Sequence, residues 1–176
     1  MGNANVSNVT IRPEEADFFA GLARDWWNPK GPMASLHQVN PVRMAFIRDA
    51  IDAHWPGSRV SAKPLAGKSA LDIGCGAADV TARFALRYPE ARILGIDAGP
   101  EMLRVGVAHI ERLGLSSRIT VEELHIPSPR LEELGAFDAF ISNSLLHHLA
   151  DPSALWESLK YSSPGAPVFV QDLRRP

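Results

Sequence analysis

The chain has a single cysteine, Cys75, among 176 residues, and it has no apolar run long enough to cross a membrane. One cysteine excludes an internal disulfide and is typical of a reducing compartment. The net charge of −2 provides no attraction to nucleic acid or to anionic lipid. The first residues also lack the apolar stretch of a signal peptide. Together these absences predict a cytoplasmic protein with no nucleic-acid partner.

The composition is that of an ordinary globular domain, because 45% of the residues are hydrophobic and 22% are charged. A chain of this length can bury a sizeable core within one domain. We expect three segments along it: a flexible N-terminus at 1–12, a helical cap at 13–63 and an α/β domain at 64–176.

Two helices are expected before the α/β domain. Apolar residues spaced three and four apart predict one helix over residues 14–27, which the segment NPKGPM would break. A second helix is expected over 41–54, with Asn40 as its N-cap, because proline is favoured at the first helical position. Trp26 and Trp27 would occupy neighbouring helical positions about 100° apart, so one of them is expected in the core.

Strand-like and helix-like segments alternate through the rest of the chain. Such alternation is typical of βαβ units, which form a parallel sheet with helices on both faces. The expected fold is therefore α/β: a doubly wound, Rossmann-like, mostly parallel sheet of about five strands. The strands are expected at 69–74, 91–97, 117–124, 136–143 and 166–173, and the helices at 77–89, 100–114, 144–149 and 151–161.

The stretch LDIGCG places two glycines directly after the first of these strands. In open α/β sheets, ligands bind beyond the carboxyl ends of the strands, at the point where the strand order reverses. Gly74 and Gly76 would let the backbone turn tightly and let a ligand approach closely. Asp79 stands where the dinucleotide fingerprint G-x-G-x-x-G has its last glycine. A plain strand-to-helix turn remains the alternative for a glycine pair alone.

Two carboxylates indicate which ligand the glycine loop would take. Asp97 ends the second expected strand, 21 residues beyond Gly76, and an acid at this distance typically binds the ribose of an adenosine cofactor. Asp72 would repel the pyrophosphate of a dinucleotide, but it would attract the sulfonium and ammonium groups of S-adenosylmethionine. The residues therefore favour S-adenosylmethionine, with Asp72 toward its methionine end. A cap for the following helix is the alternative role of Asp97.

Four stretches resemble the class I S-adenosylmethionine-dependent methyltransferases, namely LDIGCG, LGIDAGPEML, ITVEEL and FDAFISNSLLHHLADP. The segment FFAGLARDWWNPKGPMASLHQVNPVRMAFI is similar to the start of the ubiquinone-biosynthesis O-methyltransferases. This second similarity extends from Asp17 through Glu123, and the later segments are more similar to other small-molecule class I enzymes. The resemblance implies O-methylation of a small phenolic acceptor such as a ubiquinone precursor. It also implies peripheral contact with a membrane through that lipophilic substrate.

The resemblance assigns roles to particular residues. In the ubiquinone family the arginine of the NP-x-R stretch, here Arg43, reaches the cofactor. Gly74 is the first glycine of the cofactor loop, Asp97 is the ribose acid, and Asn143 lies in the loop after the fourth strand. Local pairing on an exposed helix is the alternative role of Arg43.

The chain departs from that family after the fourth strand. The ubiquinone enzymes carry an acidic pair and a histidine there to hold magnesium, whereas this chain has Ser144, His147 and His148. Magnesium prefers oxygen ligands, and neighbouring histidines on a helix would diverge, so we expect no metal. One of the two histidines is expected to act as a general base, because an imidazole titrates near neutral pH. A polar residue at the mouth of the site is the alternative.

The class has seven strands, of which this chain supplies five. We therefore expect the α/β domain to be incomplete at its C-terminus, and the strand at 166–173 to form an open edge that invites self-association. The alternative activity is N- or C-methylation of another small metabolite. A module that binds S-adenosylmethionine without turnover is the alternative from a different class.

Overall fold

The computed structural model describes residues 13–172, so the predicted flexible N-terminus and the last residue of the strand expected at 166–173 lie outside the described residues. The helices are α1 (Pro13–Leu22), α2 (Ala34–His54), α3 (Asp79–Arg87), α4 (Pro100–Arg112), α5 (Arg130–Glu133) and α6 (Ser153–Ser158). The strands are β1 (Ser69–Ile73), β2 (Arg92–Asp97), β3 (Ile119–Glu123), β4 (Ala139–Asn143) and β5 (Val168–Gln171). Residues 13–172 also contain four short 3-10 helices: η1 (Ala23–Asp25), η2 (Pro56–Arg59), η3 (Leu146–His148) and η4 (Leu159–Tyr161).

The five strands form one sheet in the order β3-β2-β1-β4-β5, and every pairing in it is parallel. This confirms the doubly wound, Rossmann-like fold expected from the alternation of strands and helices. The chain leaves β1 toward β2 on one side and returns to β4 on the other, so the strand order reverses at β1. The glycine loop that follows β1 therefore lies at the point where such sheets bind ligands.

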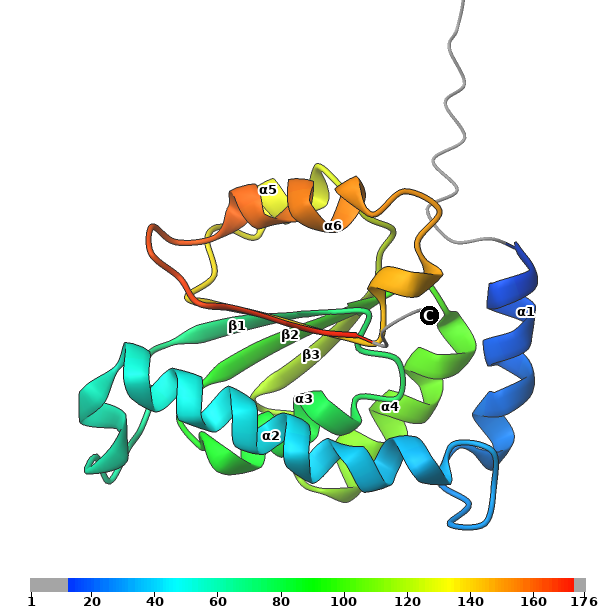
Figure 1. Cartoon of the computed structure of the whole chain (residues 1–176), viewed down its shortest axis with the longest axis horizontal. Coiled ribbons are helices and arrows are strands. Elements are labelled where there is room, and N and C mark those ends of the chain that lie inside the picture. Colours follow the sequence, from blue (N-terminus) through cyan, green and yellow to red (C-terminus); the bar gives the residue numbers. More distant parts are fainter. Residues whose placement is uncertain (1–12, 173–176) are drawn as a thin grey trace, which may run out of the picture.

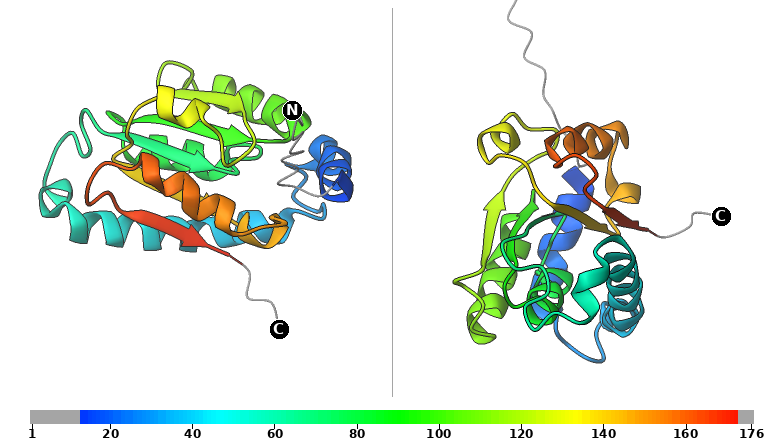
Figure 2. Two further views of the ribbon diagram at one scale, coloured as in Figure 1. Left: turned by 90° about the horizontal axis from the view of Figure 1, so that it is seen from above. Right: turned by 90° about the vertical axis from the view of Figure 1, so that its left-hand side faces the viewer.

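Helices cover both faces of the sheet, with α2, α3 and α4 on one face and α5 and α6 on the other (Figures 1 and 2). Alternate residues of a strand point to opposite faces. Ala70 of β1 belongs to the core between the sheet and α2, α3 and α4, where Ile51 and Phe84 are fully buried. Its neighbour Leu71 belongs to the opposite core, under α5 and α6, with Leu155. Strands that are buried on both faces read as short, nearly continuous apolar runs, which is why the sequence revealed them.

Helix α2 begins earlier than expected, at Ala34, so Pro41 lies within it and Asn40 is not its N-cap. Proline removes one backbone donor from the helix interior, at a cost of about 3 kcal/mol. The inward face of α2 offsets that cost, because Ile47 and Ile51 are fully buried against the sheet. Asn40 is only 2% exposed and makes a contact with another element, described below.

The first helix is shorter than expected, because α1 ends at Leu22 and the tryptophan pair follows η1 in a turn. Trp26 is 7% exposed and packs with Ala77 and Met102. Trp27 is 38% exposed, and its ring lies between those of His37 and His109, with centroids 5.0 Å and 4.2 Å away. The expectation that one tryptophan belongs to the core is therefore confirmed.

Within residues 13–172, none of the helices has both the length and the apolar character needed to span a bilayer. Helix α1 stands at the end of the sheet where the parallel strands terminate, as Figure 1 shows. The segment expected as a helical cap therefore reaches the same edge as the glycine loop.

Candidate active site

A cavity of about 310 Å³ lies at the carboxyl ends of β1, β2 and β4, between the glycine loop and α1. This volume is at the lower end of the range for sites that bind small molecules and cofactors. The cavity is lined by all eight residues that the sequence analysis assigned to cofactor binding or to catalysis: Arg43, Asp72, Gly74, Gly76, Asp97, Asn143, His147 and His148.

The backbone of the glycine loop has a conformation that residues with a side chain would adopt only with strain. Gly74 has a φ of +75°, and a Cβ built on it would lie 2.9 Å from the side chain of Leu145. Gly76 also has a positive φ, of +51°. The backbone N–H groups of Gly74 and Cys75 both donate to the carbonyl of Ile96, which holds the loop against β2. The glycines thus allow β1, the loop and the segment after β4 to meet at one point.

Asp97, at the end of β2, ties two loops together. Its Oδ2 accepts a hydrogen bond from the N–H of Gly76, and its Oδ1 accepts one from the N–H of Gly99, both at 2.8 Å. Gly99 itself is the N-cap residue of α4, and no side chain caps that helix, so Asp97 is not its N-cap. Burial raises the pKa of Asp97, and the N–H groups of Gly99 and Gly76 oppose that rise. The N–H of Ala98 also lowers that pKa, and three backbone donors still leave part of the acceptor capacity of the carboxylate for a ligand hydroxyl.

Asp72 lies deeper than expected. It belongs to β1 rather than to the lip of the strand, it is 2% exposed, and its Oδ2 accepts a hydrogen bond of 2.6 Å from the hydroxyl of Thr81. Burial raises the pKa of Asp72 to about 7, the Thr81 bond lowers it, and the nearby Asp97 raises it. The depth follows from the pairing of β1 with strands on both sides, which buries the whole strand. A cationic ligand in the cavity would favour the ionised form of this carboxyl.

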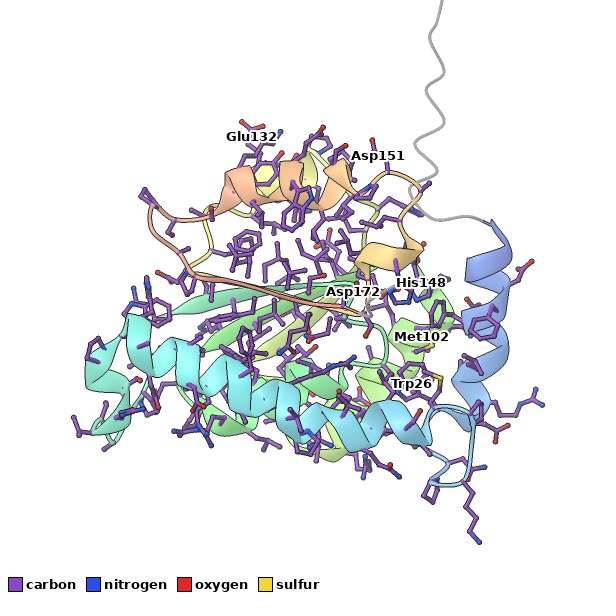
Figure 3. All side chains as sticks on the ribbon, viewed as in Figure 1. Trp26, Met102, Glu132, His148, Asp151 and Asp172 are labelled. Atoms are coloured by element: carbon purple, nitrogen blue, oxygen red, sulfur yellow. The ribbon has the colours of Figure 1, made fainter. Side chains whose placement is uncertain are left out.

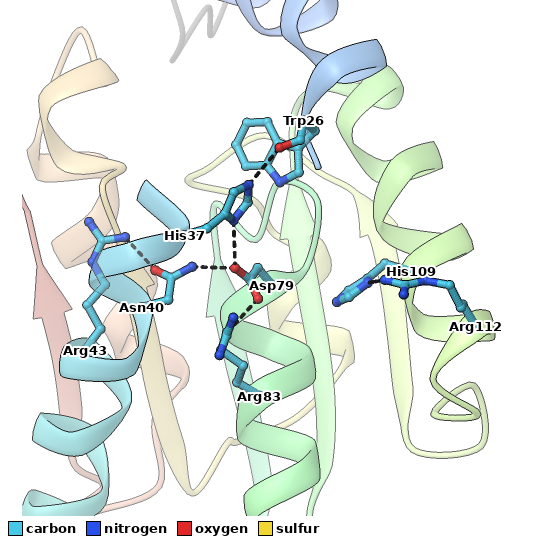
Figure 4. A network of polar contacts seen from close by, with 8 residues as sticks. All are labelled: Trp26, His37, Asn40, Arg43, Asp79, Arg83, His109 and Arg112. Atoms are coloured by element: carbon cyan, nitrogen blue, oxygen red, sulfur yellow. Dashed lines mark hydrogen bonds and ion pairs between the residues drawn. The ribbon is translucent and has the colours of Figure 1, made fainter. Parts of the chain in front are cut away.

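A polar network joins α2 to the first residue of α3 (Figure 4). Asp79 is 9% exposed, and its Oδ2 lies 3.1 Å from Nδ1 of His37 and 2.5 Å from Nδ2 of Asn40, which donates to it. Its Oδ1 accepts a bond of 2.7 Å from Nε of Arg83. Burial alone would raise the pKa of Asp79, but the bonds from His37, Arg83 and Asn40 hold it below its usual range. The other ring nitrogen of His37 lies 2.7 Å from the carbonyl of Trp26.

The sequence reasoning missed this role of His37 and Asn40. The available signal was their spacing, because His37, Asn40 and Arg43 follow one another at intervals of three, in register with the buried Ile47. Residues spaced in this way share one face of a helix. Polar residues on an apolar face of this kind indicate a buried tertiary contact.

Arg43 faces the cavity from α2 and is 9% exposed, so it is not the exposed helix residue of the alternative reading, although it does pair locally with Asn40. It donates to Oδ1 of Asn40 at 3.0 Å and to Oγ of Ser144 at 2.6 Å. Burial lowers the pKa of Arg43, against the attraction of Asp172 and Asp79. Arg43 therefore connects α2 with the segment after β4, on the opposite wall of the site.

His147 and His148 lie in the 3-10 helix η3, and their rings do not diverge as an α-helix would make them. The ring centroids are 3.8 Å apart at an interplanar angle of 43°. Nδ1 of His147 lies 2.5 Å from Oδ1 of Asp172, which directly follows β5. The ring of His148 meets that of Phe19, from α1, edge to face at 4.9 Å. Figure 3 shows Asp172 and His148 close together at this end of the sheet.

The donor set of the cavity fits an adenosyl cofactor with cationic groups. Both polar side-chain atoms of Asn143 are buried and have no partner within the described part of the chain, as expected for groups that a ligand satisfies. A pyrophosphate would meet several carboxylates instead. The acidic residues that line the cavity are Asp72, Asp79, Asp97 and Glu101. Among residues 13–172, no three histidine, cysteine or acidic side chains are placed to share a metal ion.

Comparison with known proteins agrees with this geometry. Residues 70–164 match the family described as a methyltransferase domain. The chain is 33% identical to the ubiquinone biosynthesis O-methyltransferase of Methylocella silvestris, over 94% of this chain and 65% of that protein. It is 32% identical to that of Sinorhizobium medicae, over 98% and 68%, and 28% identical to that of Psychrobacter arcticus, over 99% and 69%. The chain thus spans about two thirds of the length of these relatives.

Solved structures show the same fold. A SAM-dependent methyltransferase from Aquifex aeolicus superposes with a TM-score of 0.53 at 24% identity, covering 62% of this chain and 60% of that one. The plantazolicin methyltransferase, in complex with SAH and a pentazolic desmethylPZN analogue, gives a TM-score of 0.56 at 20% identity, covering 92% of this chain and 60% of that one. Because the family match covers more than half of the chain, this protein belongs to the class I S-adenosylmethionine-dependent methyltransferases.

Proposed function

We propose that this methyltransferase transfers a methyl group to a hydroxyl oxygen of a small phenolic acceptor, such as a ubiquinone precursor. The observation that carries the proposal is the composition of the cavity. Its acidic residues and glycine loop at the strand ends face an apolar wall that the cap contributes, and two histidines stand beside that wall. The names of the relatives from Methylocella, Sinorhizobium and Psychrobacter support the same acceptor class.

The residues around the glycine loop would hold the cofactor. When bound, S-adenosylmethionine supplies an electrophilic methyl group on a sulfonium cation. The remaining lone pairs of Asp97 suit the ribose hydroxyls, and Asp72 suits the positively charged methionine end. Arg43 keeps N–H groups beyond those given to Asn40 and Ser144, and they suit a carboxylate. The unpartnered amide of Asn143 supplies one further donor and one further acceptor.

The cap would position the acceptor. Phe19, Trp26, Met33 and Leu36 line the cavity from α1 through α2, and such a wall suits an aromatic ring and excludes water from it. Catalysis would rest on holding the hydroxyl oxygen in line with the methyl group and on removing its proton. His147 and His148 line the cavity with His125, and an imidazole can take up that proton.

A lipophilic acceptor would bring the protein to a membrane surface. Phe18 of α1 is 58% exposed although it lines the cavity, so it would contact lipid at the mouth of the site. Co-sedimentation with vesicles of phosphatidylethanolamine and phosphatidylglycerol tests this contact. The Phe18→Ser variant should no longer sediment with the vesicles. The control is Leu86→Ser, which changes an apolar residue of α3 that is 56% exposed, and this variant should still sediment with them.

The cofactor and the acceptor can be tested separately. Calorimetric titration should show binding of S-adenosylhomocysteine and none of NAD. Incubation with S-adenosylmethionine and 4-butylcatechol should then give a product in which a methyl group replaces one hydroxyl hydrogen, heavier by one CH₂ unit and with the methyl on oxygen by NMR. Methylation of a ring carbon instead would favour the C-methyltransferase alternative. Binding of S-adenosylhomocysteine without any methyl transfer would favour a binding module.

A further inference from the structure

His37 of α2 lies behind the wall of the cavity, between two hydrogen-bond acceptors (Figure 4). Its Nε2 lies 2.7 Å from the carbonyl oxygen of Trp26, and its Nδ1 lies 3.1 Å from Oδ2 of Asp79. Trp26 and Asp79 both line the cavity, whereas His37 does not. The side chain of His37 is 18% exposed, so water is largely kept from the two contacts.

The direction of each hydrogen bond around Asp79 follows from the chemistry of the partners. A guanidinium only donates, so Arg43 donates to Oδ1 of Asn40, and the amide nitrogen of Asn40 then faces Asp79 and donates to it. Arg83 donates to the other oxygen of Asp79 from a positively charged group. A carboxyl that receives a guanidinium and an amide N–H in this way is favoured as an ionised carboxylate, which only accepts.

Both ring nitrogens of His37 must therefore donate. The carbonyl of Trp26 has no proton to give to Nε2, and the ionised carboxylate of Asp79 has none to give to Nδ1. A neutral imidazole carries one N–H and would turn a lone pair toward one of these acceptors, whereas an imidazolium carries two N–H groups. The ring of Trp27 also stacks on that of His37 at an interplanar angle of 22°, and an aromatic face attracts a cation.

The second histidine beside Trp27 has the opposite requirement. Nδ1 of His109 lies 2.7 Å from a guanidinium nitrogen of Arg112, which only donates, so this nitrogen accepts and the ring is neutral. Burial and the charge of Arg112 lower the pKa of His109, in agreement with a neutral ring. Within residues 13–172, the charged or titratable groups that contact His37 directly, or through Asp79 or Trp27, are Asp79, Arg83 and His109.

We propose that His37 is a positioning residue that carries a proton on both ring nitrogens and, as a cation, holds the turn at Trp26 and Trp27 against Asp79. This inference rests on the proposed methyl transfer to a phenolic acceptor. Trp26 belongs to the apolar wall that would position that acceptor, and Asp79 is the first residue of the helix after the glycine loop. The two N–H groups of His37 therefore set the spacing between the acceptor wall and the cofactor loop.

The protonation of His37 can be measured without cofactor or acceptor. A long-range ¹H–¹⁵N correlation spectrum of the ¹⁵N-labelled full chain, assigned with a His37→Gln variant, should show a proton on each ring nitrogen of His37 at pH 7. The same spectrum should show His109 as a neutral ring with its proton on Nε2. A neutral His37 with one bare nitrogen would overturn the proposal, whether or not a variant folds or the protein turns over.

Turnover of 4-butylcatechol provides the second readout. His37→Ala should raise the KM for the catechol by about tenfold, which corresponds to the loss of one hydrogen bond to a charged group. The affinity for S-adenosylhomocysteine should change less than about twofold, because the ring of His37 does not line the cavity. His54→Ala is the matched control, since His54 is an exposed histidine of the same helix, and it should keep both values.

Chemical rescue of His37→Ala separates donation by both nitrogens from the filling of space. Protonated 4-methylimidazole has the shape of the lost side chain and an N–H on each nitrogen, whereas 1-methylimidazole has the same size but one N–H at most. At pH 7 the first compound should return the KM toward that of the parent, and the second should not.

Any other pattern of rescue, or an unchanged KM in His37→Ala, would overturn the positioning role. A parent protein that binds S-adenosylhomocysteine but methylates no catechol would overturn the proposed function instead, and the spectrum would still decide the protonation of His37.

Discussion

Asn40 Nδ2 donates to Oδ2 of Asp79 across 2.5 Å, and this bond joins the cap helix α2 to the first residue of α3. The same carboxylate oxygen meets His37, whose other nitrogen lies at the carbonyl of Trp26. A negative charge at the start of a helix is favourable in itself, because it opposes the positive end of the helix dipole. Hydrogen bonds therefore connect the cap directly to the helix after the glycine loop.

The first prediction concerns this contact between α2 and α3. Asn40→Ala should destabilise the protein by about 1–3 kcal/mol, because it leaves buried polar groups of Asp79 and Arg43 short of a partner. Gln38→Ala, an exposed change on the same helix, is the control and should stay within about 0.5 kcal/mol of the parent. Urea unfolding followed by tryptophan fluorescence measures both, and equal stabilities for the two variants would contradict the structural role of Asn40.

The second prediction is a pH dependence that Asp72 imposes. Its pKa is raised to about 7 in the folded protein, so the folded state holds a proton that the unfolded state releases near pH 4. The contribution of Asp72 to stability is therefore fully present below about pH 4, declines as the pH rises, and is lost above about pH 7. Asp72→Asn keeps an acceptor for Thr81 and carries no charge. It should be more stable than the parent at pH 8, by at most about 4 kcal/mol.

Thermal unfolding at several pH values checks this prediction. The difference between Asp72→Asn and the parent should shrink as the pH falls from 8 to 4. If the two proteins differed in stability by the same amount at pH 4.5 and at pH 8, the raised pKa of Asp72 would be contradicted. The difference would then not come from the charge of the carboxyl, which is neutral at the lower pH. Thr81→Val should destabilise at both pH values, since it removes the donor to either form of the carboxyl.

The sequence predicted the sheet well and the cap less well, for one physical reason. Strands β1, β2 and β4 are buried on both faces, so each is a nearly continuous run of apolar residues that can be recognised from the local sequence alone. The start of α2 depends instead on a distant partner. Asn40 is a good N-cap by residue type, but Asp79 takes its side chain, and burial of Ile47 and Ile51 outweighs the presence of Pro41 within the helix.

In the site too, features that depend on the local sequence were predicted, and features that depend on distant partners were not. The acids and glycines at strand ends could be placed in one cavity from the sequence, because parallel strands bring their carboxyl ends to one edge. Asp172 could not be connected with His147, since only the β4–β5 pairing brings them together. The depth of Asp72 was also missed, because a carboxylate beside a glycine loop gives no sign of how far below the loop it points.

The third prediction concerns Asp97. Asp97→Asn should weaken the binding of S-adenosylhomocysteine by about 1–3 kcal/mol, because a charged acceptor of hydroxyl hydrogen bonds is lost. The structure adds a stability cost of similar size, since the new amide group would face the N–H of Gly76 or that of Gly99. Asp151→Asn, which removes a carboxylate that accepts from the N–H of Ser153 outside the cavity, is the control. Unchanged calorimetric affinity in Asp97→Asn would leave Asp97 with a structural role only.

The fourth prediction separates Arg43 from the rest of the cap. Arg43→Ala should lower the affinity for S-adenosylhomocysteine, because the guanidinium lines the cavity, whereas Arg48→Ala should not. Arg48 lies on the same helix, but it pairs with its neighbour Asp49 and is 46% exposed. Removal of residues 1–12 should likewise leave the affinity unchanged. Calorimetry at a single pH measures all three, and equal losses in all three would indicate general destabilisation.

The fifth prediction concerns self-association through β5. The carbonyls of Pro167 and Gln171 accept from β4, and backbone groups alternate in direction along a strand, so Val168 and Val170 direct theirs outward. Within residues 13–172, no strand pairs with that outer edge. Val168 is 40% exposed there, and an open edge of β-branched residues invites another strand. We therefore expect two copies of this chain to pair through β5.

Val168→Pro tests the pairing, because it removes an outward N–H and proline is tolerated at the first residue of an edge strand. Val168→Thr keeps the N–H and the β-branched shape and serves as the control. Light scattering should give a dimer for the parent and for the threonine variant, and a monomer for the proline variant. Amide exchange adds the decisive comparison, since the outward amides at 168 and 170 should exchange more slowly as the protein concentration rises. A parent that is monomeric at high concentration, with these amides already protected, would contradict the prediction, because the edge would then be covered within one chain.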